Sequence, residues 1–280
     1  MNGAEPKGIR VAGRDGLGRP DPVLAQIRLA WLGQAGFVFV SPGGVRLAVD
    51  PYLGNACAAL GLERLLPSPT PPVDAQIDLL CVTHAHLDHL DPQGLPVWAA
   101  QGTMLVGPPS VLEQARRSPG GRRMPTRVLC RGDRLERGDV TVTAVPARHT
   151  PDSVGYVLDL PSGFRWYVTG DTMATKRLIN ESTRSCTLLS VCVNGRLGNM
   201  RPRSAARLAG ALGAEWAMPM HWGMFARNTR DPSEFVASLR EEAPTVRALV
   251  MEPFRWYQYA QVTDSDWIWR LSSVADWPAS

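Results

Sequence analysis

Three histidines and one aspartate are packed into a single short stretch of the chain. The stretch from Thr83 to His89, with the sequence THAHLDH, directly follows the apolar run Leu79–Val82, which has the composition of a buried strand. Loops at strand ends can aim several side chains at one point, because the strand behind them holds the geometry rigid. Imidazole nitrogen and carboxylate oxygen are ligands for zinc, manganese and iron. The stretch therefore predicts part of a metal centre.

The remaining ligands must come from distant parts of the chain. The sequence has five histidines, and the two outside the first stretch, His149 and His221, each follow another apolar run. Asp171 also follows such a run, in the sequence YVTGD. A lone histidine is more often a surface residue or a satisfied core residue, but no histidine in this chain is left for an incidental role. The predicted metal ligands are His84, His86, Asp88, His89, His149, Asp171 and His221.

Short apolar runs bounded by Gly, Pro or Asp recur along the chain and predict β-strands. The sequence SPGG, between the runs Phe37–Val40 and Val45–Val49, is typical of a β-hairpin. Strands come first as meanders and later alternate with helices, so we expect a mixed α/β chain whose sheets are covered by helices on their outer faces. The other predicted strands are Ile27–Leu32, Leu79–Val82, Met104–Val106, Val140–Val145, Val154–Leu160, Arg165–Thr169, Leu188–Val193 and Trp216–Met220.

Helical patterns are fewer than strand patterns. They cover Pro108–Arg117, Arg203–Leu212 and Pro232–Glu241. Asp231 is predicted to cap the third helix, because Asp before a Pro in the first turn is typical of a helix start. No Ser- or Gly-rich linker interrupts residues 26–256, so residues 23–280 are predicted to form a single domain.

Residues 1–22 are rich in Gly, Pro and charge, and we expect them to form a flexible arm. They contain no apolar core of the kind that a signal peptide or a membrane span requires, so we expect a cytoplasmic protein that does not bind membranes. The net charge is +4, but acidic and basic residues are interspersed, which does not favour a nucleic-acid partner. The five cysteines form no CxxC pair, so neither disulfides nor metal binding by cysteine is expected. A small-molecule substrate is the expected partner, and the sequence allows a homo-oligomer.

The order of these motifs resembles the metallo-β-lactamase superfamily. An HXHXDH motif after a strand is followed by a later His, then by Gly-Asp, then by a final His, and the similarity spans roughly Ile27 to Phe254. Four longer stretches resemble the branch of ascorbate-6-phosphate lactonase-like proteins. These are WLGQAGF at residues 31–37, DPYL at 50–53, NGRLGNM at 194–200 and MHWGMF at 220–225.

The resemblance implies a four-layered αββα sandwich with a dinuclear metal site along one edge of its sheets. It implies that Asp50 orients a ligand imidazole through the other ring nitrogen, whereas the alternative for Asp50 is a turn-forming role before Pro51. It also implies a division of the ligands: His84, His86 and His149 for one ion, Asp88, His89 and His221 for the second, and Asp171 as the bridge.

Two divalent cations, zinc or manganese and also iron, can share a water and lower its pKa toward about 7. The resemblance therefore implies a hydrolase that uses a metal-bridging hydroxide, with Asp88 and Asp171 as the catalytic carboxylates. No serine lies in a GXSXG nucleophile motif, which agrees with water as the attacking group. The alternative is a non-haem iron oxidoreductase on the same fold, although the chain carries no flavin or rubredoxin-like domain.

The substrate is expected to be a small anionic ester, lactone or phosphoester. Arg148 adjoins a predicted ligand, and Asn194 and Arg196 lie in a Gly-punctuated loop after an apolar run, so these three are the predicted substrate residues. Arginine grips carboxylates and phosphates with two parallel hydrogen bonds. For each residue alone, a surface Arg or a turn-forming Asn-Gly is the alternative. The aromatic residues after Phe254 are expected at a subunit interface or on the pocket wall.

Overall fold

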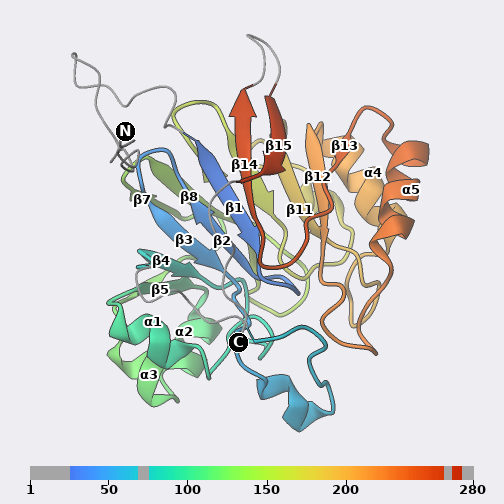
Figure 1. Ribbon diagram of the computed structural model, residues 1–280. Helices are drawn as coiled ribbons and strands as arrows, with labels where there is room; N and C mark the ends of the chain where they lie inside the picture. Colours follow the sequence, from blue (N-terminus) through green and yellow to red (C-terminus); the bar gives the residue numbers. More distant parts are fainter. Residues whose placement is uncertain (1–25, 69–75, 262–266, 273–280) are drawn as a thin grey trace, which may run out of the picture.

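The strands form two mixed sheets that pack face to face (Figure 1). The computed structural model describes residues 26–68, 76–261 and 267–272, so the predicted N-terminal arm lies outside the described residues. In spatial order, the first sheet contains β15 (Trp267–Leu271), β14 (Trp256–Gln261), β1 (Ile27–Trp31), β2 (Phe37–Val40), β3 (Arg46–Val49), β4 (Leu79–Cys81), β5 (Met104–Gly107) and β6 (Thr126–Val128). The second contains β13 (Arg247–Ala248), β12 (Trp216–Met220), β11 (Leu188–Cys192), β10 (Arg165–Val168), β9 (Val154–Asp159), β8 (Val140–Pro146) and β7 (Arg134–Arg137).

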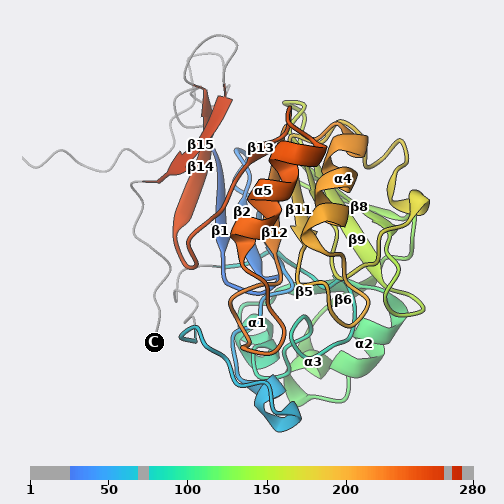
Figure 2. The same ribbon diagram turned by 90° about the vertical axis from the view of Figure 1, so that its right-hand side faces the viewer.

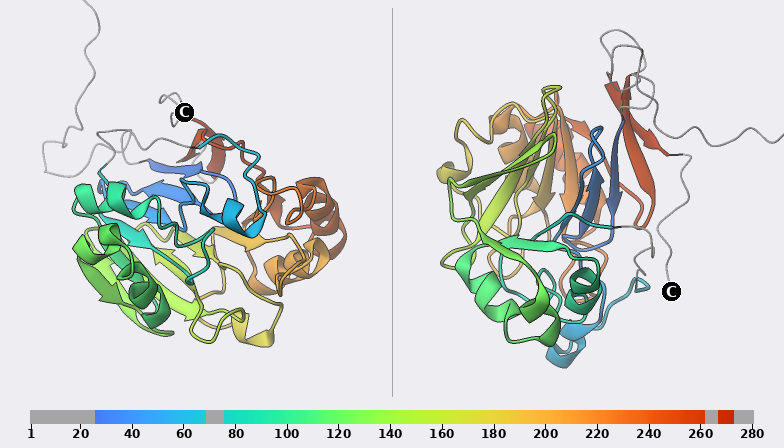
Figure 3. Two further views of the ribbon diagram at one scale, coloured as in Figure 1. Left: turned by 90° about the horizontal axis from the view of Figure 1, so that it is seen from below. Right: turned by 90° about the vertical axis from the view of Figure 1, so that its left-hand side faces the viewer.

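Helices cover the outer faces of both sheets (Figure 2). The alternation of side chains along β4 explains the layers: Leu79 and Cys81 belong to the core between the sheets, whereas Leu80 packs in a second cluster with Trp98. The predicted αββα sandwich is therefore confirmed, and Figure 3 shows its two sheets side by side. The helices of the first sheet are α1 (Leu95–Ala100), α2 (Pro109–Ala115) and α3 (Pro119–Arg123), those of the second are α4 (Pro202–Leu212) and α5 (Pro232–Glu242), and the 3-10 turns are η1 (Ala56–Leu60) and η2 (Lys176–Leu178).

An aromatic contact joins the two sheets in the core. Phe37 and Phe39 of β2 meet Trp166 of β10, with ring centroids 5.4 Å and 5.6 Å from that of the tryptophan. The one polar group of Trp166 is satisfied, because Nε1 donates a hydrogen bond to Oγ of Ser190 at 2.9 Å. Full burial of a side chain of this kind contributes about 1.5–3 kcal/mol. The contact therefore fixes the spacing of the sheets that carry the site.

The C-terminal aromatic residues extend the first sheet. Strands β14 and β15 pair beside β1 at its edge, and Tyr257, Tyr259 and Trp269 belong to the core cluster. The ring of Tyr259 lies 5.4 Å from that of Phe164, which directly precedes β10 of the other sheet. The expected place for these residues, a subunit interface or the pocket wall, is therefore wrong for these three, which pack inside the sandwich.

Two local predictions are confirmed. The SPGG turn joins β2 and β3 as an antiparallel hairpin, closed by a hydrogen bond from Gly44 N to Ser41 O at 3.0 Å. The side chain of Asp231 caps α5 by accepting a hydrogen bond from Ser233 N at 2.8 Å. Within the described ranges, no helix has both the length and the apolar character needed to cross a membrane.

Candidate metal centre

Strand direction brings the predicted ligands to one edge of the sandwich. In the second sheet β10, β11 and β12 are parallel, and β8 runs in the same direction as β10 because both are antiparallel to β9. His149, Asp171 and His221 follow β8, β10 and β12, so all three leave the sheet at the same edge. In the first sheet β3 and β4 are parallel, which places Asp50 beside the loop that begins at Thr83.

A glycine lets the loops of the two sheets approach each other. Gly170 has a φ of +59°, and a Cβ at this position would lie 2.9 Å from Cβ of Thr83. Any other residue would be strained in this backbone conformation and would clash with the threonine. The glycine before Asp171 therefore lets the aspartate come close to the histidines that follow β4.

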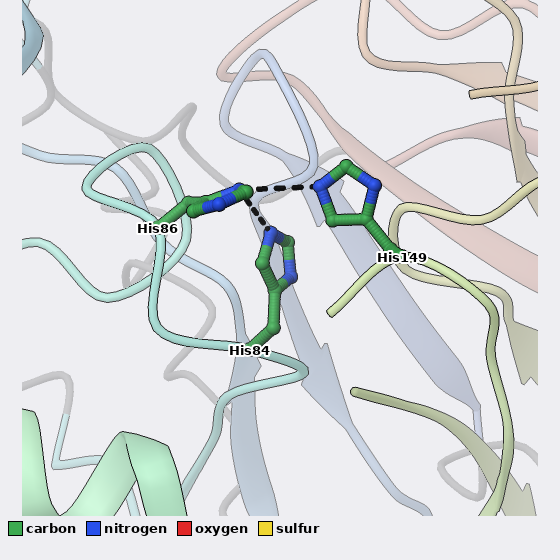
Figure 4. A group of neighbouring side chains, drawn as sticks. All are labelled: His84, His86 and His149. Atoms are coloured by element: carbon green, nitrogen blue, oxygen red, sulfur yellow. Dashed lines mark hydrogen bonds between the residues drawn. The ribbon is translucent and has the colours of Figure 1, made fainter. Parts of the chain in front are cut away.

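Three of the predicted ligands form a group of imidazoles, shown in Figure 4 and called here the histidine triad: His84, His86 and His149. Nε2 of His84 lies 2.9 Å from Nδ1 of His86, and Nε2 of His149 lies 3.2 Å from the same atom. The three side chains come from both sheets and converge on one point. This is the group that the resemblance assigns to the first ion.

A second group, called here the mixed triad, contains Asp88, His89 and His221. Oδ2 of Asp88 lies 3.4 Å from Nε2 of His221 and 3.8 Å from Nε2 of His89. Asp171 lies between the groups: its Oδ2 is 3.2 Å from Nε2 of His221 and 3.6 Å from Nε2 of His149. The structure thus brings all seven predicted ligands together, with Asp171 in contact with both triads.

The mixed triad and Asp171 fit a cation better than they fit a hydrogen-bond network. Nε2 of His89 and Oδ1 of Asp171 are buried and have no hydrogen-bond partner among the described residues, and they lie 3.5 Å apart. This separation is long for a hydrogen bond. Two ligand atoms about 2.0–2.1 Å from a tetrahedral zinc ion lie about 3.3 Å apart. The donor set of imidazoles and carboxylates also suits a divalent transition metal.

The pKa values divide the site into two halves. Burial lowers the pKa of each imidazole in the histidine triad, so these rings are neutral and offer lone pairs. Burial acts in the same direction on His89 and His221, but Asp171 and the other nearby carboxylates outweigh it and raise both pKa values, that of His221 to about 9. The carboxylates therefore attract positive charge to the mixed triad, which a bound cation also supplies.

Asp50 lies directly behind the mixed triad. Its carboxylate is fully buried and accepts hydrogen bonds from N and Oγ1 of Thr83, at 2.8 Å and 2.7 Å. It also lies 2.8 Å from Nδ1 of His89. This contact leaves Nε2 of His89 facing Asp171, and a carboxylate on the far ring nitrogen is the usual support for a metal-binding imidazole.

Gln34 is a site residue that sequence reasoning missed. Its Nε2 lies 2.7 Å from Oδ2 of Asp88 and 3.1 Å from Nε2 of His221. Gln34, Asp50 and His221 have φ angles of +51°, +43° and +65°, and they are three of the six non-glycine residues with positive φ in the described chain. Such conformations cost about 1–3 kcal/mol each and often mark functional sites. Its position in the WLGQAGF stretch is the one sequence signal that could have indicated Gln34.

The candidate ligands open onto a cavity of about 810 Å³, and those that line it are His86, Asp88, His149, Asp171 and His221. Arg148 is exposed and lines this cavity. Asn194 is buried, and its Nδ2 donates a hydrogen bond to Oδ1 of Asn228, a lining residue, at 2.7 Å. Arg196 is exposed outside the lining, whereas its neighbour Leu197 is part of it. Of the three predicted substrate residues, the structure therefore brings Arg148 to the cavity wall.

Comparisons with solved structures give the same fold. A metallo hydrolase from the hyperthermophilic archaeon Ignicoccus hospitalis superposes with a TM-score of 0.69 at 21% identity, over 84% of this chain and 99% of that chain. CmlA, a diiron β-hydroxylase from Streptomyces venezuelae, superposes with a TM-score of 0.60 at 14% identity, over 86% of this chain and 55% of that chain. At these identities the likeness concerns the fold alone.

Sequence comparisons identify the family. A UPF0173 metal-dependent hydrolase from Nitratidesulfovibrio vulgaris is 29% identical over 241 residues, which cover 81% of this chain and 93% of the relative. The model of the β-lactamase superfamily domain matches residues 45–222, a segment that contains the THAHLDH motif and all seven candidate ligands. Because this match covers more than half of the chain, the protein belongs to the β-lactamase superfamily.

Proposed function

We propose that this protein is a hydrolase that depends on two divalent metal ions and acts on a small anionic ester, lactone or phosphoester. The observation that carries the proposal is the convergence of both triads and Asp171 on one open cavity. The relatives named metal-dependent hydrolases support the same activity. The WLGQAGF, DPYL, NGRLGNM and MHWGMF stretches support a place in the ascorbate-6-phosphate lactonase-like branch.

The residues would hold zinc, manganese or iron in two neighbouring positions. The histidine triad would hold one ion, the mixed triad the other, and Asp171 would contact both. Ions bound in this way lower the pKa of a coordinated water and polarise the bond under attack. Asp88 and Asp171 stay ionised because nearby imidazoles hold their pKa values below the usual range despite burial. Both carboxylates line the cavity and can orient the attacking water through hydrogen bonds.

Water is a better candidate for the attacking group than a side chain. Cys57 is the one thiol among the residues that line the cavity. Burial and the charge of Asp88 raise its pKa to about 11, so the thiol stays protonated at neutral pH and is a weak nucleophile. This favours direct hydrolysis without a covalent intermediate.

Arg148 supports an anionic substrate. It is exposed on the wall of the cavity and is adjacent in the chain to the ligand His149. A guanidinium group can bind a carboxylate or phosphate with two parallel hydrogen bonds. Asn194 would act on the substrate indirectly, through its hydrogen bond to the lining residue Asn228. Arg196 lies outside the lining and would need a change in its loop to reach the substrate.

The alternative function is that of a non-haem iron oxidoreductase. The same donor atoms accept iron, and CmlA provides an example of a diiron enzyme with a domain of this fold. Oxygen isotopes separate the two functions. We expect hydrolysis in ¹⁸O-labelled water to place the label in the product, because water is the attacking group. Label that enters from ¹⁸O₂ instead would favour the oxidoreductase.

Metal content tests the two positions. Elemental analysis of purified protein is expected to give close to two divalent ions per chain, and removal by a chelator should abolish hydrolysis. Asp171→Ala should lower the content to one ion or fewer, because this carboxylate contacts both triads. Asp139→Asn is the control, since its carboxylate binds Ser41 on the β2–β3 hairpin. Full activity in metal-free protein would contradict the proposal.

Steady-state kinetics test the role of Arg148. A hydrogen bond to a charged group contributes about 1.5–3 kcal/mol, so Arg148→Ala should lower kcat/KM for an anionic substrate by about ten- to a hundredfold. Arg148→Lys keeps the charge but loses the planar fork and should recover part of the loss. Arg240→Ala, on the exposed face of α5, is the matched control. An unchanged kcat/KM in fully metallated Arg148→Ala would leave Arg148 as a surface residue.

A further inference from the structure

Large apolar side chains are exposed around the mouth of the metal-site cavity. Leu60, Met173 and Leu197 are 67%, 43% and 75% exposed, and all three line the cavity. Leu62 and Leu87 line it as well. Soluble proteins rarely leave such side chains grouped in water unless the surface binds something. We call these five residues the apolar rim.

One side of the apolar rim is anchored to the body of the protein. Leu60 ends the η1 turn. Leu62 and Leu87 pack against a small buried cluster that contains Tyr52, Cys57, Met224 and Phe225. This side therefore has a fixed position next to the mixed triad, because Leu87 directly precedes Asp88 in the chain.

The other side of the apolar rim lies beside the histidine triad. Met173 follows Asp171 by two residues, and Leu197 lies in the loop after β11. At the next residue, Gly198, a Cβ would lie 3.6 Å from Nδ1 of His149 and 3.8 Å from Cγ of Met173. The loop that carries Leu197 therefore passes close to both the methionine and a candidate ligand. Apolar surface thus flanks the candidate metals from two directions.

We propose that the substrate carries an apolar chain next to the bond that is hydrolysed, and that the apolar rim binds this chain. The proposal rests on the proposed hydrolase function and specifies its substrate class as amphipathic. A cavity of about 810 Å³ is large enough to hold an anionic group together with an apolar chain. Arg148 is the one Arg or Lys among the lining residues, which matches a single anionic group beside the chain.

The test uses two chromogenic series on the metal-loaded protein. Alkyl 4-nitrophenyl phosphates from methyl to octyl carry the expected anionic group, and the uncharged 4-nitrophenyl alkanoates from acetate to octanoate test the apolar chain alone. We expect kcat/KM to rise about three- to fourfold per methylene, the effect of burying one such group, until the cavity is filled. Leu60→Ser and Leu197→Ser should each reduce the increment per methylene. Leu65→Ser is the matched control, because Leu65 is 60% exposed in the same segment but does not line the cavity.

Binding separates this proposal from the proposed function. The affinity of n-alkyl phosphonates, measured by calorimetry, should increase with chain length and lose this dependence in the Leu60 and Leu197 variants. If the phosphonate affinity increases with chain length but neither series is hydrolysed, the result would support the apolar rim and contradict the hydrolase function. Hydrolysis and phosphonate binding that are both independent of chain length would overturn the rim and keep the hydrolase function.

A separate observation concerns Gln34. The side chain is fully buried, its Nε2 contacts Asp88 and His221, and its Oε1 has no hydrogen-bond partner among the described residues. The backbone is engaged too, because Gln34 O accepts a hydrogen bond from His221 N at 2.8 Å. Trp31 Nε1 donates to the same carbonyl at 3.1 Å. The side chain and the backbone of Gln34 therefore both contact the mixed triad.

We infer that Gln34 is a positioning residue for the mixed triad. A hydrogen bond to Oδ2 fixes the rotation of the Asp88 carboxylate, and the contact with the ring restricts His221. Among the described residues, the side chain of Gln34 makes no hydrogen bond to His84, His86 or His149. Loss of the amide should therefore affect one metal position and spare the other.

Stepwise titration of metal-free protein with Co²⁺, followed by its visible absorption, tests this inference. In Gln34→Leu, one binding step should weaken by about tenfold or more, the loss expected from disturbing a supporting contact, while the other stays within about twofold. Gln34→Glu keeps the shape but replaces the donor by an acceptor, and should act in the same direction. Thr103→Val is the control, because it removes a buried hydrogen bond to Ile77 O away from the site. Two unchanged steps, or two equally weakened steps, would overturn the inference.

Discussion

Buried negative charge is the constraint on which the rest of the site depends. Asp50 and Asp171 are 0% and 5% exposed, and a carboxylate in such a place is costly unless it is paired, hydrogen-bonded or bound to a metal. Asp50 is satisfied by Thr83 and His89. Oδ1 of Asp171 has no hydrogen-bond partner among the described residues. It lies 3.5 Å from Nε2 of His89, which also has none. Hydrogen bonds within the protein therefore satisfy the charge of Asp50, whereas a bound cation would satisfy the free oxygen of Asp171.

The two sheets meet this constraint through the direction of their strands. Parallel strands end at one edge, so residues that follow β4, β8, β10 and β12 converge although they are far apart in the chain. The aromatic contact of Trp166 with Phe37 and Phe39 sets the distance between the sheets, and Gly170 sets the approach of their loops. Core packing and site geometry are thus two results of the same arrangement.

The sequence predicted those parts of the molecule that have a local signal. The candidate ligands follow apolar runs, and the SPGG turn and the Asp231 cap depend only on neighbouring residues. Short elements without such a signal were missed: α3 has the sequence PGGRR, and every residue of β6 is exposed. Gln34 was missed because a glutamine contacts a distant carboxylate only after folding. Likewise, no pattern indicates that Leu197, rather than Arg196, reaches the cavity, because the loop backbone decides between adjacent residues.

The distribution of the ligands has a mechanical consequence. His84 and His89 belong to loops of the first sheet, whereas His149, Asp171 and His221 belong to loops of the second. An ion held by both sets would act as a cross-link between the two halves of the sandwich, as a disulfide does in secreted proteins. It would close a chain loop of about 65 residues at the histidine triad and one of about 130 residues at the mixed triad. All five cysteines of this chain are free thiols, so a metal cross-link would take the place of a disulfide. It would restrict the relative motion of the two sheets and resist their separation.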